Sequence, residues 1–353
     1  MRKIVLFLLG LALFCAGTNT AVAKDLKVGL VYIGHIGDAG WTYAHEMGRL
    51  AIAEMPGVTT SYVEAVAEGA DSERVIQNMA RKGYGLIFTT SFGYMDPTLK
   101  VAKRFPNVIF MHCSGFKTAK NVGNYFGRMY QARYLSGMVA GAMTTSNKIG
   151  YVAAFPIPEV IRGINAFTLG ALAVNPKAQV NVVWTKTWYD PATEKEGGKS
   201  LLETGCDVIT QHQDTPGVQE AAEEAGKYSI GYNSDMSRFA PKAHLTAPVW
   251  KWGPFYQTIV KAVQNGTWKT GAYWPGLESG IVDLAPFGPM VPKNVQDTVL
   301  AKKQEIAQGA FKVFAGPIKD QSGTVKILAG TVASDGELLG MDWFVQGVQG
   351  STK

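Results

Sequence analysis

Two tryptophans stand in loops that follow predicted strands in different halves of the chain. Trp41 comes after the run LKVGLVYI, and Trp188 comes after VNVVW. An indole offers a flat apolar face on which a planar ring can stack, together with one N–H donor. Packing against a sheet would explain a single loop tryptophan. A pair at corresponding places in two halves instead favours stacking on a shared ligand.

Small polar groups and further aromatic rings accompany both tryptophans at the strand ends. Such groups could hydrogen-bond the edge of a ring that is held between the indoles. From these loops we predict a ligand-binding site that includes Asp38, Trp41, Thr42, Ser91, Phe92, Gly93, Trp188, Gln213 and Asp235. Two of them have simpler explanations, because Asp235 could cap the helix that follows it and Phe92 could pack within its own loop.

A catalytic site is the alternative use of the same polar residues. His112 ends a strand-like run and could act with Asp38 or Asp235 in an exported nucleoside-cleaving hydrolase. A lone histidine beside a strand is more often a structural hydrogen bonder. The sequence contains no G-x-S-x-G, H-E-x-x-H or G-x-x-x-x-G-K-[ST] motif and no Cys/His spacing typical of a metal site. We therefore expect a binding protein that is not an enzyme and needs no cofactor.

The elements that must position these loops alternate between strands and helices. Apolar runs such as LKVGLVYI and LIFTT alternate with helix-like segments, and the pattern starts again near Lys148. Strict alternation with buried strands is typical of parallel sheets covered by helices on both faces. We predict an α/β fold of two doubly wound lobes, with an eight-fold barrel as the alternative. Ligands bind beyond the carboxyl ends of strands in open sheets, so both sets of loops would face one cleft.

The composition is that of a globular chain that is long enough for two domains. The 353 residues are 46% hydrophobic and 18% charged, and single cores usually stop growing near about 250–300 residues. The 34 basic and 28 acidic residues give a net charge of +6, and both signs are dispersed along the chain. Because no basic run resembles a nucleic-acid-binding patch, we expect no nucleic-acid partner.

The first 23 residues read as a cleaved secretory signal. A short basic stretch precedes the apolar run Ile4–Cys15, and Ala21-Val22-Ala23 supplies an A-x-A cleavage site. Twelve apolar residues are too few to span a membrane, which takes about 20. The large Phe14 precedes Cys15 where a lipoprotein signal needs a small residue, so we expect no lipid anchor. The mature protein is predicted to be periplasmic and not membrane-spanning, with Cys113 and Cys206 either paired or as two separate buried thiols.

Several stretches that together cover nearly the whole mature chain resemble one family. The chain is similar to the basic membrane protein (Bmp) family of ABC-transporter substrate-binding proteins, which includes purine-nucleoside receptors. The resemblance is carried by GDAGWTYAHEMG (37–48), EGADSERVIQNMARKGYGLIFTTSFGY (68–94), YQARYLSGMVAGAM (130–143), FPIPEVIRGINAFTLGA (155–171), TWYDPATE (187–194), GYNSDM (231–236) and MDWFVQGV (341–348). It implies a type I periplasmic-binding fold, in which two α/β lobes joined by three crossovers close on a small-molecule ligand. It also implies an ABC transporter permease as partner, and we expect a monomer.

The expected lobes are each made of two pieces of chain. We predict that residues 24–145 and about 246–275 form the first lobe. Residues 146–245 and about 276–353 would form the second lobe.

The resemblance implies a sandwich in which Trp41 and Trp188 stack on the two faces of a base, while Asp235 contacts its polar edge or its sugar. Nucleoside-binding relatives carry a lysine that reaches the ribose, and Trp250 occupies that position here. The family's first-lobe aspartate is also missing, and His112 or Ser114 lies in its place. We therefore add Trp250 to the predicted site and expect a purine nucleobase such as adenine to be preferred to a nucleoside. A receptor for a sugar or another small ligand is the remaining alternative.

Overall fold

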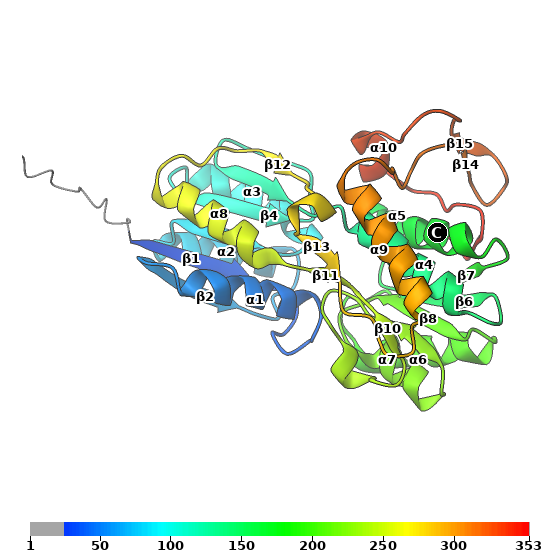
Figure 1. The fold of residues 1–353 in the computed structure, drawn as a ribbon. Helices are drawn as coiled ribbons and strands as arrows, with labels where there is room; N and C mark the ends of the chain where they lie inside the picture. Colours follow the sequence, from blue (N-terminus) through cyan, green and yellow to red (C-terminus); the bar gives the residue numbers. More distant parts are fainter. Residues whose placement is uncertain (1–24, 353) are drawn as a thin grey trace, which may run out of the picture.

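The computed structural model describes residues 25–352, and these form two α/β lobes that stand side by side (Figure 1). Each lobe is built on a six-stranded sheet, and every strand pair within the two sheets is parallel. The predicted two-lobed α/β class is confirmed, and two open sheets replace the alternative of one closed barrel. The predicted signal peptide, residues 1–23, lies outside the described residues.

The first sheet has the strand order β12-β5-β4-β3-β1-β2. Its strands are β1 (Leu26–Val31), β2 (Val58–Val63), β3 (Leu86–Thr89), β4 (Ile109–Cys113), β5 (Val122–Tyr125) and β12 (Ala272–Tyr273). One face is covered by α1 (Trp41–Ala53) and α8 (Trp252–Gln264), which pack together, and the other by α2 (Ala70–Arg81) and α3 (Met95–Arg104). Helices on both faces explain why β3, with four apolar or β-branched residues, is buried throughout.

The second sheet has the strand order β10-β9-β8-β6-β7-β16. Its strands are β6 (Lys148–Ala153), β7 (Gln179–Trp184), β8 (Val208–His212), β9 (Tyr228–Ile230), β10 (His244–Thr246) and β16 (Val348–Gln349). Its helices are α4 (Met129–Met143) and α5 (Pro158–Val174) in one layer, and α6 (Pro191–Glu203) and α7 (Gly217–Glu224) in the other. The remaining pieces are α9 (Lys293–Ala307) on α4, the strands β14 (Ile318–Lys319) and β15 (Val325–Ile327), α10 (Asp335–Leu339), and three short 3-10 turns at Phe92–Tyr94, Ser237–Phe239 and Leu277–Ser279.

The chain passes between the lobes three times. It leaves the first sheet after β5, returns through β11 (Pro248–Trp250) to α8, and leaves again through β13 (Val282–Leu284) to α9. Strands β11 and β13 pair antiparallel between the lobes (Figure 1). These three connections form the hinge.

One predicted lobe boundary is wrong. The first crossing was expected near residue 145, but α4 belongs to the second lobe because it packs closely against α5. A methyl group on Gly137 would lie 1.9 Å from the backbone carbonyl oxygen of Phe167, and one on Gly170 would lie 1.9 Å from that of Tyr134. The chain therefore crosses between β5 and α4, at residues 126–128. The periodicity of a small-residue helix does not tell which sheet the helix covers.

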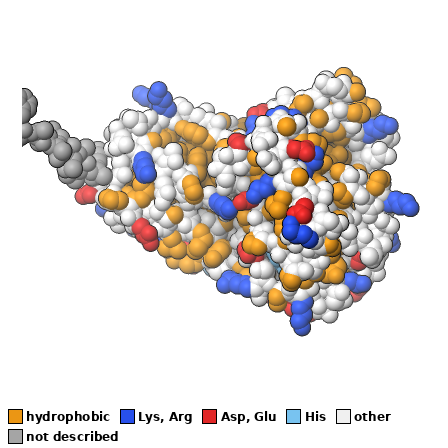
Figure 2. Space-filling view, viewed as in Figure 1, with side chains coloured by type: hydrophobic (Ala, Val, Ile, Leu, Met, Phe, Trp, Pro, Cys, Tyr) orange, Lys and Arg blue, Asp and Glu red, His pale blue; other side chains and the backbone are white. Residues whose placement is uncertain are grey.

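Three further features concern the described residues outside the cleft. Cys113 and Cys206 are both free and buried, each in a different lobe, so they do not pair. Within residues 25–352, no helix combines the length and apolar character that crossing a bilayer requires. Basic and acidic side chains are interspersed on the face drawn in Figure 2, so that face carries no continuous basic patch.

Candidate functional site

A small cavity of about 30 Å³ lies between the lobes, where the carboxyl ends of the two sheets face each other. It is lined from the first lobe by Ile33, Trp41, Ser91, Phe92 and Ser114, and from the second by Glu159, Trp188, His212, Asp214, Tyr232 and Asn233. Most of these residues follow a strand, and Trp41 and Glu159 begin helices α1 and α5. Open parallel sheets bind ligands at such strand ends. This volume is far below the range of about 300–1,000 Å³ for ligand pockets, so side chains nearly fill the closed cleft and the lobes must open to admit a ligand.

A larger hollow of about 450 Å³ lies away from the strand ends, between α9 and the C-terminal segment. Its walls include Arg128, Phe314 and Asp335, and the guanidinium of Arg128 forms an ion pair with Asp335 at 2.7 Å. Its walls come from the hinge and the second lobe alone, so closing the two lobes would not enclose a ligand there. We therefore assign the candidate site to the smaller cavity between the lobes.

Aromatic rings form opposite walls of this cavity. The Trp41 indole N–H donates to the backbone carbonyl of Thr90 at 2.7 Å, and its ring meets His45 edge-on with centroids 4.4 Å apart. These contacts fix the indole in the first lobe beside the half-buried Phe92. Trp188 comes from the second lobe and packs on Phe155, with ring centroids 5.1 Å apart. The two predicted stacking residues thus line one cavity from different lobes, while stacking on a ligand stays a prediction.

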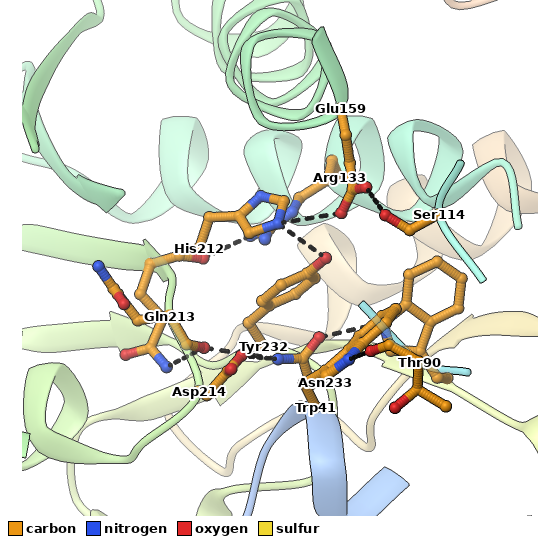
Figure 3. Close-up of polar contacts among 12 residues, drawn as sticks. Trp41, Thr90, Ser114, Arg133, Glu159, His212, Gln213, Asp214, Tyr232 and Asn233 are labelled. Carbon is orange, nitrogen blue, oxygen red and sulfur yellow. Dashed lines mark hydrogen bonds and ion pairs between the residues drawn. The ribbon is translucent and has the colours of Figure 1, made fainter. Parts of the chain in front are cut away.

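A chain of polar groups crosses the cavity from lobe to lobe (Figure 3). The Ser114 hydroxyl donates to Glu159 Oε2 at 2.6 Å, and Glu159 Oε1 lies 3.6 Å from His212 Nε2. The same His212 nitrogen is 3.3 Å from the Tyr232 hydroxyl. Burial lowers the pKa of His212 to about 4, so the imidazole is neutral at pH 7. These groups offer a ligand one carboxylate acceptor, a neutral imidazole and hydroxyl groups.

A second pair of polar residues in the cavity consists of the amide of Asn233 and the carboxyl group of Asp214. The Asn233 amide donates to Asp214 Oδ1 at 3.1 Å, and its oxygen accepts from the Trp250 indole N–H at 3.0 Å. Burial raises the pKa of Asp214 well above its ordinary value, and the negative charge of Asp38 acts in the same direction. Asp38 belongs to the first lobe and Asp214 to the second, so this repulsion acts across the cleft.

Three predicted first-lobe residues lie outside the cavity lining. Asp38 accepts hydrogen bonds from the backbone N–H groups of Gly40, Thr42 and Tyr43 at 2.8–2.9 Å, and so binds the N-terminus of α1. The hydroxyl of Thr42 accepts from the backbone N–H of Gly34 at 3.2 Å. Gly93 donates its backbone N–H to Glu68 Oε1 at 2.9 Å. All three shape the loops that carry Trp41 and Phe92 instead of lining the cavity.

Three predicted residues of the second lobe and the hinge lie outside it as well. Gln213 supports the Trp188 loop, since in the amide orientation that pairs both ends its nitrogen lies 3.2 Å from the Trp188 carbonyl. The Asp235 side chain is 46% exposed and caps the turn at Ser237, whose backbone N–H it accepts at 2.9 Å. Trp250 is buried behind Trp41 and stacks on Trp252, with ring centroids 4.6 Å apart. The sequence led us to expect Trp250 within the ligand site, but its ring lies behind the wall of the cavity and does not line it.

The residues of the hydrolase alternative do not form a catalytic group. His112 Nε2 contacts the backbone carbonyl of Ser91 at 2.8 Å, and burial lowers the pKa of His112 to about 4. Asp38 and Asp235 each bind backbone N–H groups, as described above. None of the three lines the cavity. The described residues also contain no group of His, Cys, Asp and Glu that could hold a metal ion.

Sequence reasoning recognised the right loops but missed several lining residues. They are Ile33, Ser114, Glu159, His212, Asp214, Tyr232 and Asn233. His212 and Asp214 flank the predicted Gln213, and Asn233 stands two positions before the predicted Asp235. Glu159 belongs to a stretch that carried the family resemblance, and its place in the first turn of a helix facing the cleft was the available signal.

Comparisons with known proteins agree on a transport family. The sequence profile of the PnrA-like ABC transporter substrate-binding proteins (Bmp) matches residues 25–315. A purine-binding protein of Brucella abortus is 46% identical over 337 residues, which make up 95% of this chain and 96% of that protein. A putative ABC transporter glucose-binding protein of Haloferax volcanii is 42% identical over 301 residues, or 85% of this chain and 77% of that protein. A solved ABC-transporter solute-binding protein of Aeropyrum pernix has a TM-score of 0.72 at 21% identity, covering 84% of this chain and 93% of that one, and shows the same fold.

Proposed function

Because the chain belongs to the PnrA-like family of ABC-transporter substrate-binding proteins, we propose that it is a periplasmic receptor that binds a purine between its lobes and delivers it to an importer. The observation that carries this proposal is the pair Trp41 and Trp188, which line one small cavity from opposite lobes. A flat heterocycle between them would bury both faces when the lobes close. Closure would then signal the loaded state to the permease.

The polar groups of the cavity suit the edge of a heterocycle. A purine base carries ring nitrogens that accept hydrogen bonds beside N–H groups that donate them. Glu159 can accept from such an N–H, and the Asn233 amide can both donate and accept. A site built to pair these groups rejects ligands that lack them, because buried polar groups would be left unpaired.

We further propose that the free base binds more tightly than the nucleoside. None of the residues that line the cavity is a lysine or an arginine, so no cation is at hand to donate several hydrogen bonds to a ribose. Trp250 does not contribute to this preference, because it lies behind Trp41 and donates its indole N–H to Asn233 Oδ1.

A sugar receptor is the second candidate, and the relative from Haloferax volcanii favours it because its name gives glucose as the ligand. Carboxylates and tryptophans also form sugar sites. The Brucella abortus relative, which is named for purine binding, matches at higher identity over more of both chains. We therefore rank the purine first.

Calorimetric titration of the purified mature protein would test the proposal. The ligands are adenine, guanine, hypoxanthine, adenosine, guanosine and glucose. We expect a dissociation constant in the micromolar range or below for at least one base, and weaker binding of its nucleoside. Binding of glucose with no binding of any purine would overturn the purine assignment, and equal or tighter binding of the nucleoside would overturn the preference for the base.

A further inference from the structure

Behind the cavity wall, four buried polar atoms have no hydrogen-bond partner among the described residues. They are Nε and Nη2 of Arg133, the hydroxyl of Tyr151, and Nδ1 of His212. Arg133 lies on α4, Tyr151 on β6 and His212 at the end of β8, so three different elements contribute. Arg133 and Tyr151 are fully buried and His212 is 5% exposed. Unsatisfied polar atoms at this depth are rare and costly, so each calls for a partner.

These atoms surround the missing side chain of a single glycine. A methyl group on Gly163, in α5, would lie 3.7 Å from His212 Nδ1 and 3.8 Å from both Arg133 Nε and the Tyr151 hydroxyl. Apart from the chain neighbours and the backbone of α5 itself, no atom is closer, so a space about the size of a methyl group is bounded there by polar groups. A space of this kind, with several polar partners, is where proteins bind internal water.

We propose that Gly163, Arg133 and Tyr151 form a buried site for one water molecule, and that this water fixes His212 as a neutral N–H donor toward the ligand cavity. The guanidinium can only donate, so it gives its N–H groups to the water oxygen. The water then donates to the Tyr151 hydroxyl and to His212 Nδ1. Because Nδ1 accepts this bond, the imidazole proton is on Nε2.

The surrounding charges support this assignment. Arg133 lies with its guanidinium carbon 3.5 Å from the centre of the Tyr232 ring and donates to the backbone carbonyl of Gln211 at 2.7 Å, which anchors it beside His212. Burial lowers the pKa of His212, and the positive charge of Arg133 lowers it further. A cation on this side disfavours a proton on Nδ1. On the other side, the carboxylate of Glu159 faces Nε2 and favours a proton there (Figure 3).

The consequence for the ligand rests on the proposed function. The His212 Nε2–H donor and the Glu159 carboxylate acceptor lie side by side. Together they would bind a ligand edge that carries a hydrogen-bond acceptor beside an N–H donor. Purine bases have such edges. Arg133, Tyr151 and Gly163 are positioning residues in this scheme, since none of them lines the cavity.

Nuclear magnetic resonance of the full mature protein with ¹⁵N-labelled histidine would test the tautomer. The chain has five histidines, and a His212→Gln variant assigns the His212 signals. At pH 7 we expect a protonated Nε2 and a bare, hydrogen-bonded Nδ1. A protonated Nδ1, as a bound anion in place of the water would require, or an imidazolium, overturns the proposal.

Two variants test the water itself. Gly163→Ala meets no steric clash and gains helix propensity, so without a water it should raise the melting temperature. We expect it to lower the melting temperature, because the methyl group displaces the water, and to shift the His212 Nδ1 signal. The matched control is Gly336→Ala in α10, where the nearest atom is 3.9 Å away. A higher melting temperature in Gly163→Ala together with an unchanged His212 signal would overturn the water site.

Tyr151→Phe is the second variant, because it keeps the ring and removes only the hydroxyl. We expect it to shift the His212 Nδ1 signal in a folded protein, and an unchanged signal counts against the water. Adenine titrated into the same samples separates the two proposals. A protein that binds no purine but shows the predicted tautomer refutes the proposed ligand and leaves this inference standing.

Discussion

Asn233 has a left-handed backbone conformation, with φ at 68°, in the loop after β9 that borders the ligand cavity. The turn brings the Asn233 amide to the cavity and leaves Asp235 on the surface. Ser114, with φ at 77°, is also left-handed; it follows β4 and lines the cavity. The sequence pattern locates such loops from the strands that precede them. It does not predict which side chains of the loop face the cavity, because the regular alternation of side chains along a strand ends at a left-handed turn. For this reason we predicted Asp235 as a cavity residue, whereas Asn233 lines the cavity. Trp41 and Trp188 were correctly predicted to line it.

The residue-scale prediction is that Trp188→Ala weakens purine binding while the fold persists. Stacking on an aromatic ring contributes about 1–3 kcal/mol per base, which corresponds to a loss of about 5- to 150-fold in affinity. The control is Trp184→Ala, because Trp184 lies in β7 outside the cavity and faces Phe344, with ring centroids 6.3 Å apart. Calorimetry gives the affinities, and thermal unfolding of the ligand-free variants checks the fold. Equal affinity losses in both variants would mean that Trp188 does not stack on the ligand.

At the scale of elements, alternation of apolar runs and helical segments predicted the sheets because each buried strand must be covered on both faces. It could not predict that α4 covers the second lobe. That choice depends on the contact between Gly137 and the Phe167 carbonyl, and between Gly170 and the Tyr134 carbonyl. These contacts join segments that are distant in sequence, and a glycine within a helical pattern does not indicate which helix packs against it. The short strands β12 and β16 were also not predicted, because a strand of two residues is too short to show the alternation of apolar and polar side chains.

The element-scale prediction is that Gly137→Ala lowers the stability of the protein. The added methyl group would lie 1.9 Å from a backbone carbonyl, so α4 and α5 must move apart. Overpacking of this kind costs about 1–3 kcal/mol, which outweighs the gain of up to about 1 kcal/mol from helix propensity. Urea unfolding measures the change, and Gly336→Ala again serves as the helix control. A stability equal to or above that of the wild type would show that the two helices can separate without cost.

At the scale of the whole molecule, the two lobes touch across the cleft as well as at the hinge. Ser114 donates to Glu159, the Ser234 hydroxyl donates to the backbone carbonyl of Ala39, and Gly40 lies against the backbone carbonyl of Asp214. A methyl group on Gly40 would lie 2.2 Å from that carbonyl oxygen, so the lobes could not approach as closely with any other residue there. The structure is thus that of closed lobes, and closing buries the carboxyl groups of Asp38 and Asp214 in the same interface.

Closure of the lobes should therefore take up protons. Burial raises the pKa of Asp38 to about 6, against hydrogen bonds from the Tyr43, Gly40 and Thr42 backbone N–H groups that lower it. Asp214 is raised well above its ordinary value by burial and then by the charges of Asp38 and Glu194. Opening the lobes would bring water to both carboxyl groups and separate their charges, so we expect the pKa of each to be lower in the open form. Groups whose pKa rises on closure stabilise the closed form at low pH, and this contribution is lost as pH rises through the raised values.

The whole-molecule prediction is that ligand binding is accompanied by proton uptake and weakens as the pH rises through the raised pKa of Asp214. The Asp38 pKa of about 6 leaves that group largely ionised at pH 7.5, so proton uptake at this pH would report on Asp214. His212 acts with the opposite sign, because its lowered pKa makes closure release a proton, but only below its ordinary value of about 6.5. Titration calorimetry in buffers of different ionisation enthalpy counts the protons. Asp214→Asn keeps a partner for Asn233 and should abolish the uptake, whereas Asp235→Asn, on the surface, should preserve it. Binding without proton uptake in the wild type would mean that Asp214 stays ionised in the closed cleft.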